Sequence, residues 1–331
     1  MLREPVRAAA FLEMLMSQPS SSEFMSGQLF PKETLIKGQP AHINCVEICG
    51  QIFSVSRGAL TVVSLEDEWY EDLANPETVV AGLSGGIGFK PDLLTFWQRM
   101  PDVDPKHSYH LEWEEIAVLP ITSYGHWWKN QIKSRVRNQI RKAEKEGVVV
   151  KEALYDDEFV RGMTAIFNEA PIRQGRRFWH YGKDFETVKR QFSRFVFREH
   201  MIGAYYQGEM IGFVMLGNAG RFGITGQIIS SIKHRDKSPN NALIAKAVEV
   251  CATEGLAYLI YLFWSDDSLA EFKRRCGFDK IRVPRYYVPL SWKGELALKC
   301  GAHRGWKTRL PKVLTSLLKK MRGMWLGFRA E

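Results

Sequence analysis

Short apolar segments rich in β-branched residues predict a small β-sheet in the first third of the chain. Residues 43–49, 52–55 and 60–65 form three such segments, and Gly50 and Gly58 separate them. This spacing is typical of short antiparallel strands joined by turns.

The neighbouring segments predict an arm, a helix and one further strand. Residues 1–40 have no sustained hydrophobic period, which indicates an N-terminal arm. Pro91 and Asp92 stand where a helix can begin, and we expect that helix to end at Met100. Residues 112–119 have the composition of a strand.

Residues 126–147 form the clearest predicted helix. Apolar residues recur in this segment at helical spacing, and Gly147 stands where such a helix would end. The apolar stripe consists of Trp128, Ile132, Val136, Ile140 and Ala143.

A strand and two capped helices are predicted next. The strand covers residues 148–151. Asp156 can cap a helix that ends near residue 169, and Asp184 can cap a second helix that ends near residue 199.

The remaining core elements predict an antiparallel meander, a helix, a buried strand, a helix and a last strand. Ser238 as N-cap and Pro239 in the first turn begin the first of these helices, which ends at Gly255. Asp266 can cap the second, which ends at Cys276. The predicted strands are residues 202–206, 210–216, 222–231, 257–263 and 278–288, with a tight hairpin at Gln207-Gly208-Glu209.

Composition and length exclude a disordered or membrane-spanning chain. Hydrophobic residues make up 45% of the 331 residues and charged residues 25%, which matches a globular protein. The longest apolar stretch, residues 256–264, is too short to cross a bilayer, and residues 1–22 lack the apolar core of an export signal. The five cysteines form neither an even set nor a metal pattern. We therefore expect a cytoplasmic protein without a metal site.

The net charge of +9 is concentrated in two segments. Residues 126–147 carry seven Lys or Arg against two Glu, and residues 291–331 carry ten against two. Basic segments of this kind favour anionic partners. In the first segment the cations Lys129, Lys133, Arg137, Arg141 and Lys145 recur at every fourth position. They can contact a polyanion such as tRNA, or they can form an ordinary solvated face.

The order of elements from residue 148 onward resembles that of the GNAT superfamily of acyltransferases. Details of the sequence are similar to the Fem-type branch, which transfers amino acids from aminoacyl-tRNA to peptidoglycan precursors. The similar segments are RNQIRKAEKEGV (137–148), GEMIGFV (208–214), HRDKSPNNALIAKAV (234–248) and SLAEFKRRCGF (268–278).

The resemblance implies an α/β (α+β) fold with a GNAT-like mixed sheet flanked by helices. It also implies a smaller, degenerate GNAT-like N-terminal half. We expect an arm at 1–40, the small β-rich domain at 41–125, the basic helix and catalytic domain at 126–290, and a basic amphipathic tail at 291–331.

The start of the helix at Pro239 is the expected binding site for the phosphates of an acyl donor, either acyl-CoA or aminoacyl-tRNA. Helix N-termini offer free N–H groups and a partial positive charge. GNAT enzymes usually place a glycine-rich loop here, but residues 235–240 lack both glycines. The alternative is an ordinary capped helix. The candidate donor-binding residues are His234, Arg235, Lys237, Ser238, Asn240 and Asn241.

Two residues are candidate catalytic groups. Lys273 stands where many GNAT enzymes have a tyrosine that protonates the leaving group, and the resemblance to Fem-type proteins implies a lysine on the donor side. The alternative is a solvated lysine on an exposed helix face. We expect its replacement by alanine to leave the fold intact and to lower turnover. Glu169 is a candidate general base.

Cations and aromatic residues alternate in the segment 171–184, which in GNAT folds shapes the acceptor pocket. Guanidinium groups bind a carboxylate or phosphate well, and aromatic rings offer stacking surfaces. The alternative is a basic surface loop. The candidate acceptor-binding residues are Arg173, Arg176, Arg177, His180 and Tyr181.

The C-terminal residues 309–325 predict an amphipathic helix with a basic face. Such a helix can lie on an anionic membrane surface, which would place the protein at the membrane periphery, or it can cover the core. Taken together, the sequence favours an acyltransferase with an amine acceptor. A non-catalytic binding module on a degenerate GNAT scaffold is the alternative from a different class, and Fem-type peptidoglycan transfer is a narrower enzyme function.

Overall fold

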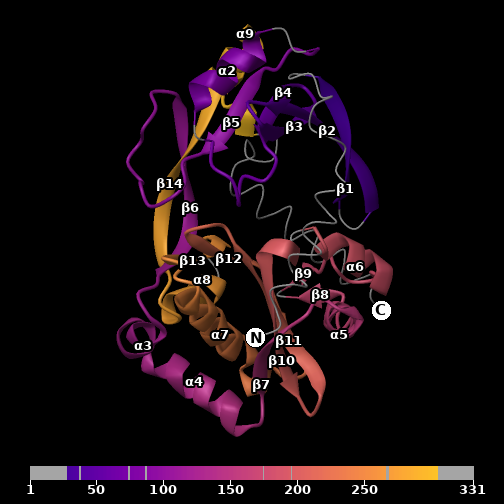
Figure 1. Cartoon of the computed structure of the whole chain (residues 1–331), viewed down its shortest axis with the longest axis vertical. Coiled ribbons are helices and arrows are strands. Elements are labelled where there is room, and N and C mark those ends of the chain that lie inside the picture. Colours follow the sequence, from indigo (N-terminus) through magenta and orange to yellow (C-terminus); the bar gives the residue numbers. More distant parts are fainter. Residues whose placement is uncertain are drawn as a thin grey trace.

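A single mixed sheet runs through both halves of the molecule. The computed structural model describes residues 28–304 apart from 37, 38, 74, 86, 87, 174, 195, 266 and 267. Within these residues, twelve strands form one sheet in the order β1-β2-β3-β4-β5-β14-β6-β13-β12-β11-β10-β7, flanked by helices (Figure 1). The predicted mixed α/β class is confirmed.

The N-terminal half is an antiparallel meander followed by one parallel crossover. β1 (Leu29–Ile36), β2 (Gln39–Ile48), β3 (Gln51–Arg57) and β4 (Thr61–Leu65) pair in chain order. The helix α2 (Pro76–Ser84) then carries the chain to β5 (Leu93–Trp97), which runs parallel to β4. The three strands predicted between residues 43 and 65 are therefore confirmed.

Two predictions about this half are wrong. The segment 91–100, predicted as a helix, contains the strand β5. All five residues of β5 are buried, and an apolar run of this kind shows neither a helical nor an alternating period, so its pattern does not distinguish a strand from a helix. The sheet also begins in the predicted arm, since β1 pairs with β2 along its length. Residues 1–27 lie outside the described part.

The C-terminal half repeats the same order of elements. β10 (Glu199–Tyr206), β11 (Glu209–Asn218) and β12 (Phe222–Ser230) form an antiparallel meander. The helix α7 (Pro239–Thr253) leads to β13 (Tyr258–Phe263), which runs parallel to β12. This repetition is what a degenerate GNAT-like first half implies.

Each half contributes its next strand to the other half. β6 (His110–Pro120) follows β5 in the chain but pairs with β13, and β14 (Asp279–Pro289) follows β13 but pairs with β5. β6 and β14 also pair with each other, and they run together along one side of the molecule between the halves (Figure 1). Backbone hydrogen bonds therefore join the two halves into one body.

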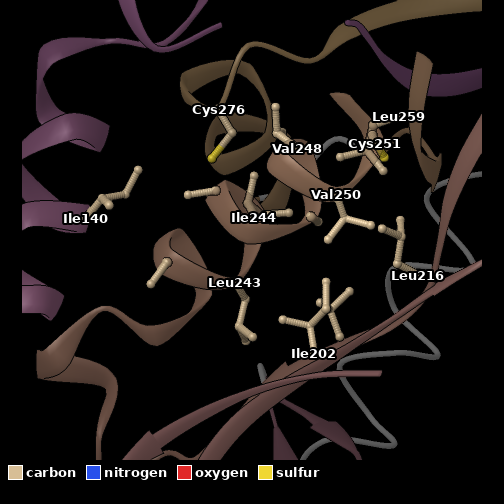
Figure 2. Close-up of a cluster of buried hydrophobic side chains, with 14 of the residues drawn as sticks. Ile140, Ile202, Leu216, Leu243, Ile244, Val248, Val250, Cys251, Leu259 and Cys276 are labelled. Carbon is tan, nitrogen blue, oxygen red and sulfur yellow. The ribbon is translucent and has the colours of Figure 1, made fainter. Parts of the chain in front are cut away.

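Helices cover both faces of the sheet in the C-terminal half. α7 packs on one face, and the helix α4 (Ser134–Lys145) packs on α7. Figure 2 shows Ile140 of α4 facing Leu243 and Ile244 of α7, with Ile202 and Leu216 of the sheet on the far side. The helices α5 (Asp157–Phe167) and α6 (Phe185–Phe192) cover the opposite face. Asp156 and Asp184 cap them as predicted.

The predicted helix at 126–147 is interrupted. The chain forms α3 (Tyr124–His126), a π-helical turn η1 (Trp127–Gln131), an extended link and then α4. The guanidinium of Arg137 donates to the carbonyls of Trp128 and Ile132 at 3.0 and 2.8 Å, so it satisfies groups that a continuous helix would have paired. The apolar stripe is buried as predicted, through Val136, Ile140 and Ala143.

The second predicted helix ends earlier than expected. α6 stops at Phe192, a short 3₁₀ turn η2 (Val196–Arg198) follows, and Glu199 is the first residue of β10. The remaining elements are β7 (Val149–Ala153), β8 (Ile172–Arg173), β9 (Arg176–Arg177), η3 (Arg235–Lys237), α8 (Ser268–Arg275), α9 (Trp292–Lys299) and η4 (Ala302–Arg304).

Two predictions fall outside the described residues: the cap at Asp266 and the amphipathic segment at 309–325. None of the described helices is long and apolar enough to cross a membrane.

Candidate active site

A cavity of about 610 Å³ lies between the two halves. The N-terminal half contributes Trp69 and Tyr70, from the loop after β4. The C-terminal half contributes the start of β10 and the segment around the end of α6, together with residues of β11, β12 and β13. We call this cavity the interdomain cleft.

The cleft reaches the point where β12 and β13 separate. These strands pair only from Phe222 to Ile224 on one side and from Tyr258 to Ile260 on the other. Beyond that point Gln227 of β12 and Leu262 of β13 both line the cleft. A parallel pair that opens in this way exposes backbone groups that neither strand satisfies, so polar atoms of a ligand can bind there.

A buried carboxyl group lies in the wall of the cleft. The Oε1 atom of Glu199 accepts a hydrogen bond of 3.0 Å from the hydroxyl of Tyr70, and its Oε2 atom is buried without a hydrogen-bond partner. Burial raises the pKa of Glu199 to about 7, although the hydrogen bond from Tyr70 opposes this shift. Burial and the neighbouring Glu199 likewise raise the pKa of Tyr70. Glu199 can therefore exchange a proton near neutral pH.

A glycine makes this contact between the halves possible. Gly217 of β11 is the register partner of Glu199, and a Cβ atom on it would lie 2.4 Å from the hydroxyl oxygen of Tyr70. Any larger residue would displace the Tyr70 ring from the sheet. The contact between Tyr70 and Glu199 therefore requires a side chain from each half, and it requires that residue 217 be glycine.

Lys273 is buried, which excludes the solvated-lysine alternative. Lys273 is 1% exposed, and its ammonium group donates hydrogen bonds to the carbonyls of Tyr261 and Phe263 at 2.8 and 2.7 Å. Both carbonyls belong to the part of β13 beyond its pairing with β12. The ammonium therefore stabilises the opened strand. Alanine would leave these carbonyls without their charged donor, so the structure leads us to expect that Lys273→Ala destabilises the fold, contrary to the prediction from the sequence.

Glu169 is held as an anion by four donors. Its two oxygens accept from Ser231 Oγ at 2.8 Å, from the amides of Ile232 and Lys233 at 2.6 and 2.9 Å, and from the guanidinium of Arg173 at 3.1 Å. Burial alone would raise the pKa of Glu169, but these hydrogen bonds outweigh it and lower the pKa. A carboxylate that is so fully satisfied is a poor proton acceptor, so Glu169 fixes the loop after β12 and does not suit a general base.

The loop before α7 is tied to α4. Ser238 has a left-handed backbone, with φ of 57°, and its side chain does not cap the helix. Its hydroxyl instead contacts Gln139, and Lys237 pairs with Glu146 at 3.2 Å. The predicted N-cap position of Ser238, with Pro239 in the first turn, is confirmed, but the hydroxyl contacts α4 and does not cap the helix. The side-chain oxygen Oδ1 of Asn240 is buried there without a partner.

The other predicted donor-site residues lie in the same loop or just after it. His234 packs its ring near that of Tyr206, with centroids 5.6 Å apart. Arg235 is exposed, and Asn241 donates its backbone amide to the carbonyl of Ser238 at 3.1 Å. The structure thus gathers the six predicted residues at the start of α7.

The comparisons with known proteins concern this whole arrangement. The sequence matches no family model and no curated protein. Its structure is similar to that of FemX, with 12% identity, a TM-score of 0.55, and coverage of 82% of this chain and 90% of FemX. The fold is GNAT-like, of the Fem type.

Two further solved structures share the Fem-type arrangement at low identity. One is the C-terminal domain of a putative lysylphosphatidylglycerol synthetase from Agrobacterium fabrum, with 10% identity and a TM-score of 0.54 over 78% of this chain and 87% of that one. The other is L-PGS from Bacillus licheniformis, with 15% identity and a TM-score of 0.51 over 77% of this chain and 87% of that one.

The five residues predicted to bind the acceptor are not gathered into one site: some are buried and some are exposed. The side chain of Arg173 is 9% exposed and donates to the carbonyls of Ser230 and Ile166 at 2.9 and 2.5 Å, so it ties the segment to β12 and α5. His180 is 1% exposed and stacks on Phe167 at 4.3 Å. Burial, aided by the charge of Lys183, lowers the pKa of His180 to about 3.

The remaining three acceptor candidates lie at the surface. Arg176 and Arg177 in β9 and Tyr181 after it are exposed. Beneath them, Lys183 donates to Gln191 at 2.6 Å, and Gln191 lines the interdomain cleft. Buried Lys183 of the segment 171–184 therefore helps to hold Gln191 in the wall of the cleft. The exposed residues of this segment can contact a ligand that approaches from solvent.

Sequence reasoning missed the Tyr70–Glu199 pair. Glu199 was assigned to the end of a helix, and the residues around Tyr70 carry no periodic signal. The one available signal is local: Glu199 lies three residues before the predicted strand at 202–206, which in the structure begins at Glu199 itself. A strand boundary placed a few residues earlier would have put a carboxylate at the edge of the sheet.

Proposed function

We propose that this protein is an acyltransferase that moves an acyl or aminoacyl group from a phosphate-bearing donor to an amine in the interdomain cleft. The observation that carries this proposal is Glu199, a buried carboxyl with a pKa near 7 in a cavity that reaches the separation of β12 and β13. Catalytic bases work best when their pKa lies near the operating pH.

In the proposed reaction the acceptor nitrogen attacks the carbonyl carbon of the donor. Glu199 removes a proton from this nitrogen as the new C–N bond forms. Backbone N–H groups of β12 beyond its pairing with β13 stabilise the oxyanion. The bond to the leaving oxygen or sulfur then breaks, and the proton carried by Glu199 ends on that atom. Tyr70 keeps the carboxyl oriented through its hydroxyl.

The donor phosphates would bind at the start of α7. The backbone N–H groups of a helix N-terminus and the exposed Arg235 suit an anion there. The two glycines that wrap CoA pyrophosphate in many GNAT enzymes are replaced, and the side chains of Ser238 and Lys237 already contact α4. This favours aminoacyl-tRNA over acyl-CoA as the donor.

The exposed cations of η1, of α4 and of the link between them would contact the tRNA backbone. Lys129, Lys133 and Lys145 are exposed on the segment that adjoins the loop before α7. Their charges are compatible with the phosphates of a donor whose acylated end enters the opened sheet. Contact of residues 309–325 with an anionic membrane stays a prediction.

The test is a transfer assay with two donors and one inactive variant. Full-length protein is incubated with a lipid and peptidoglycan-precursor extract, and with either radiolabelled aminoacyl-tRNA or radiolabelled acetyl-CoA. We expect label to move to an extracted amine from aminoacyl-tRNA, and the variant Glu199→Gln to lose this transfer while it keeps donor binding.

Two other outcomes would change the assignment. Transfer from acetyl-CoA alone would keep the reaction type and replace the donor. Donor binding without transfer, equal in wild type and variant, would refute the enzyme and support a binding module on a degenerate scaffold. The identity of the labelled acceptor decides whether the function is Fem-type transfer to peptidoglycan precursors.

A further inference from the structure

Three side chains of the types that bind metal ions lie close together at the start of β6. One of them is far from the other two in the sequence, so no short sequence motif reveals the group. His110 and Glu112 are two residues apart on β6 and therefore share a face, and His303 belongs to η4 near the end of the described chain. One nitrogen of each histidine and one oxygen of Glu112 all lie within 4.8 Å of one another. Glu112 Oε1 is 2.6 Å from His303 Nε2 and 3.9 Å from His110 Nε2.

The surroundings of His303 resemble those of a metal ligand. Its side chain is 2% exposed, its ring packs against Tyr287 at 4.8 Å, and its Nδ1 atom lies 3.3 Å from the carbonyl of Ala297. Histidines that bind metals commonly donate the other ring N–H to a backbone carbonyl, which fixes the orientation of the ring.

Without a metal, a neutral His303 can donate its Nε2–H to Glu112, because 2.6 Å is a good hydrogen-bond distance and the 3.3 Å contact of Nδ1 with Ala297 is the weaker of the two. A metal ion on Nε2 would replace this proton, and the ring N–H would then lie on Nδ1 and face the carbonyl of Ala297. An experiment must therefore separate a metal site from a hydrogen-bonded cluster.

We propose that His110, Glu112 and His303 bind a divalent transition-metal cation, with Zn²⁺ as the best match. Two imidazoles and one carboxylate form a ligand set that zinc uses, and water can complete the tetrahedron. Zinc bonds to nitrogen and oxygen are about 2.0 to 2.2 Å long, which places two ligands of a tetrahedral zinc roughly 3.3 Å or more apart. Glu112 Oε1 and His303 Nε2, now 2.6 Å apart, must therefore separate by roughly 0.7 Å or more on binding. The side chain of His110 is 41% exposed, and its ring packs edge-on to that of His303, so a small shift would bring its Nε2 atom to the same ion.

Arg304 is the competitor for this site. Its Nε atom donates to Glu112 Oε1 at 2.6 Å, and its side chain is 57% exposed. A metal ion that binds Glu112 must displace this guanidinium, which can move into solvent. The proposal therefore predicts that Arg304 weakens metal binding, whereas a simple ion-pair cluster predicts only that Arg304 stabilises the fold.

The metal would have a structural role. It would join the turn after α9 to β6, and neither histidine nor Glu112 lines the interdomain cleft. The proposal is independent of the proposed acyl transfer, and its readout is binding and stability.

The experiment uses full-length protein that has been treated with chelator and dialysed. Zn²⁺ is titrated by calorimetry, and thermal melts are recorded with and without an excess of Zn²⁺. We expect one equivalent to bind and the melting temperature to rise by about 4 °C or more at a hundredfold excess over Kd. His110→Ala removes an exposed ligand and should weaken binding at least tenfold. Arg304→Ala should strengthen binding and enlarge the Zn²⁺-dependent shift.

Two controls exclude other zinc ligands. His126→Ala removes an exposed histidine of α3, and Cys300→Ser removes an exposed thiol near the proposed site. Both should bind Zn²⁺ as the wild type does. The proposal is overturned if Zn²⁺ does not stabilise the wild type, if His110→Ala binds equally well, or if Cys300→Ser loses binding.

Discussion

We expect Glu199→Gln to stabilise the protein at alkaline pH while it removes acyl transfer. Burial raises the pKa of Glu199 from 4.5 to about 7 in the folded protein. Below pH 4.5 the group is neutral in both folded and unfolded states, and it contributes no cost. As the pH rises through 7, the folded state must hold a buried carboxylate, so stability from this group is lost.

The size of the effect follows from the pKa difference. About 2.5 pKa units at 1.36 kcal/mol each correspond to about 3 kcal/mol at pH 8.5, and the same linkage gives less than about 1 kcal/mol at pH 5. Glutamine keeps the shape of the side chain and an oxygen that can accept from Tyr70, but it never ionises. For a chain of this size the variant should melt roughly 5 °C higher at pH 8.5.

The assay is a pair of thermal melts at pH 5 and pH 8.5. Glu209→Gln in the exposed hairpin is the matched control, because it makes the same chemical change at the surface. The control should melt like the wild type at both values. A difference between Glu199→Gln and wild type that does not change with pH, or a less stable variant at pH 8.5, would refute the account of Glu199 as a buried base.

Four further variants test the described contacts. Tyr70→Phe removes the hydrogen bond that lowers the pKa of Glu199, so the midpoint of the pH–rate profile should move to higher pH; an unchanged midpoint would remove Tyr70 from the site. Lys273→Met should lower the free energy of unfolding by roughly 3 kcal/mol in denaturant titrations, because two carbonyls lose a charged donor. Replacing Lys129, Lys133 and Lys145 by Gln should reduce the log–log salt slope of tRNA binding by about 2, with the melting temperature unchanged. Arg137→Gln should instead lower the melting temperature, because Arg137 satisfies two carbonyls, and equal salt slopes for all variants would argue against tRNA contact.

The parts of the fold that the sequence predicted well have local signals. Gln207 and Gly208 both adopt positive φ in the predicted hairpin, and Asp156 and Asp184 cap the helices that follow them. Polar side chains and turn residues of this kind act on their own backbone, so neighbouring residues suffice to recognise them. The order of the predicted elements is then sufficient to predict the fold class.

The parts that could not be predicted depend on residues far apart in the chain. Nothing local distinguishes β5 from a buried helix, because its apolar residues are covered on both sides by segments from elsewhere. Arg173 and His180 resemble ligand-binding residues in the sequence, but Arg173 donates to the carbonyl of Ser230 in β12 and His180 stacks on Phe167 of α5. Charge and ring type alone do not show whether a side chain faces inward.

The role of the small first half follows from the position of Glu199. This carboxyl belongs to the C-terminal half, but the ring that donates to it belongs to the N-terminal half. Without that half, water would reach Glu199, and its pKa would return towards the ordinary value because burial is the main cause of the shift. The exchange of β6 and β14 fixes the two halves through backbone hydrogen bonds, so the cleft keeps its geometry without a separate interface. The N-terminal half thus supplies the hydrogen-bond donor and part of the burial that together set the pKa of a carboxyl group in the C-terminal half.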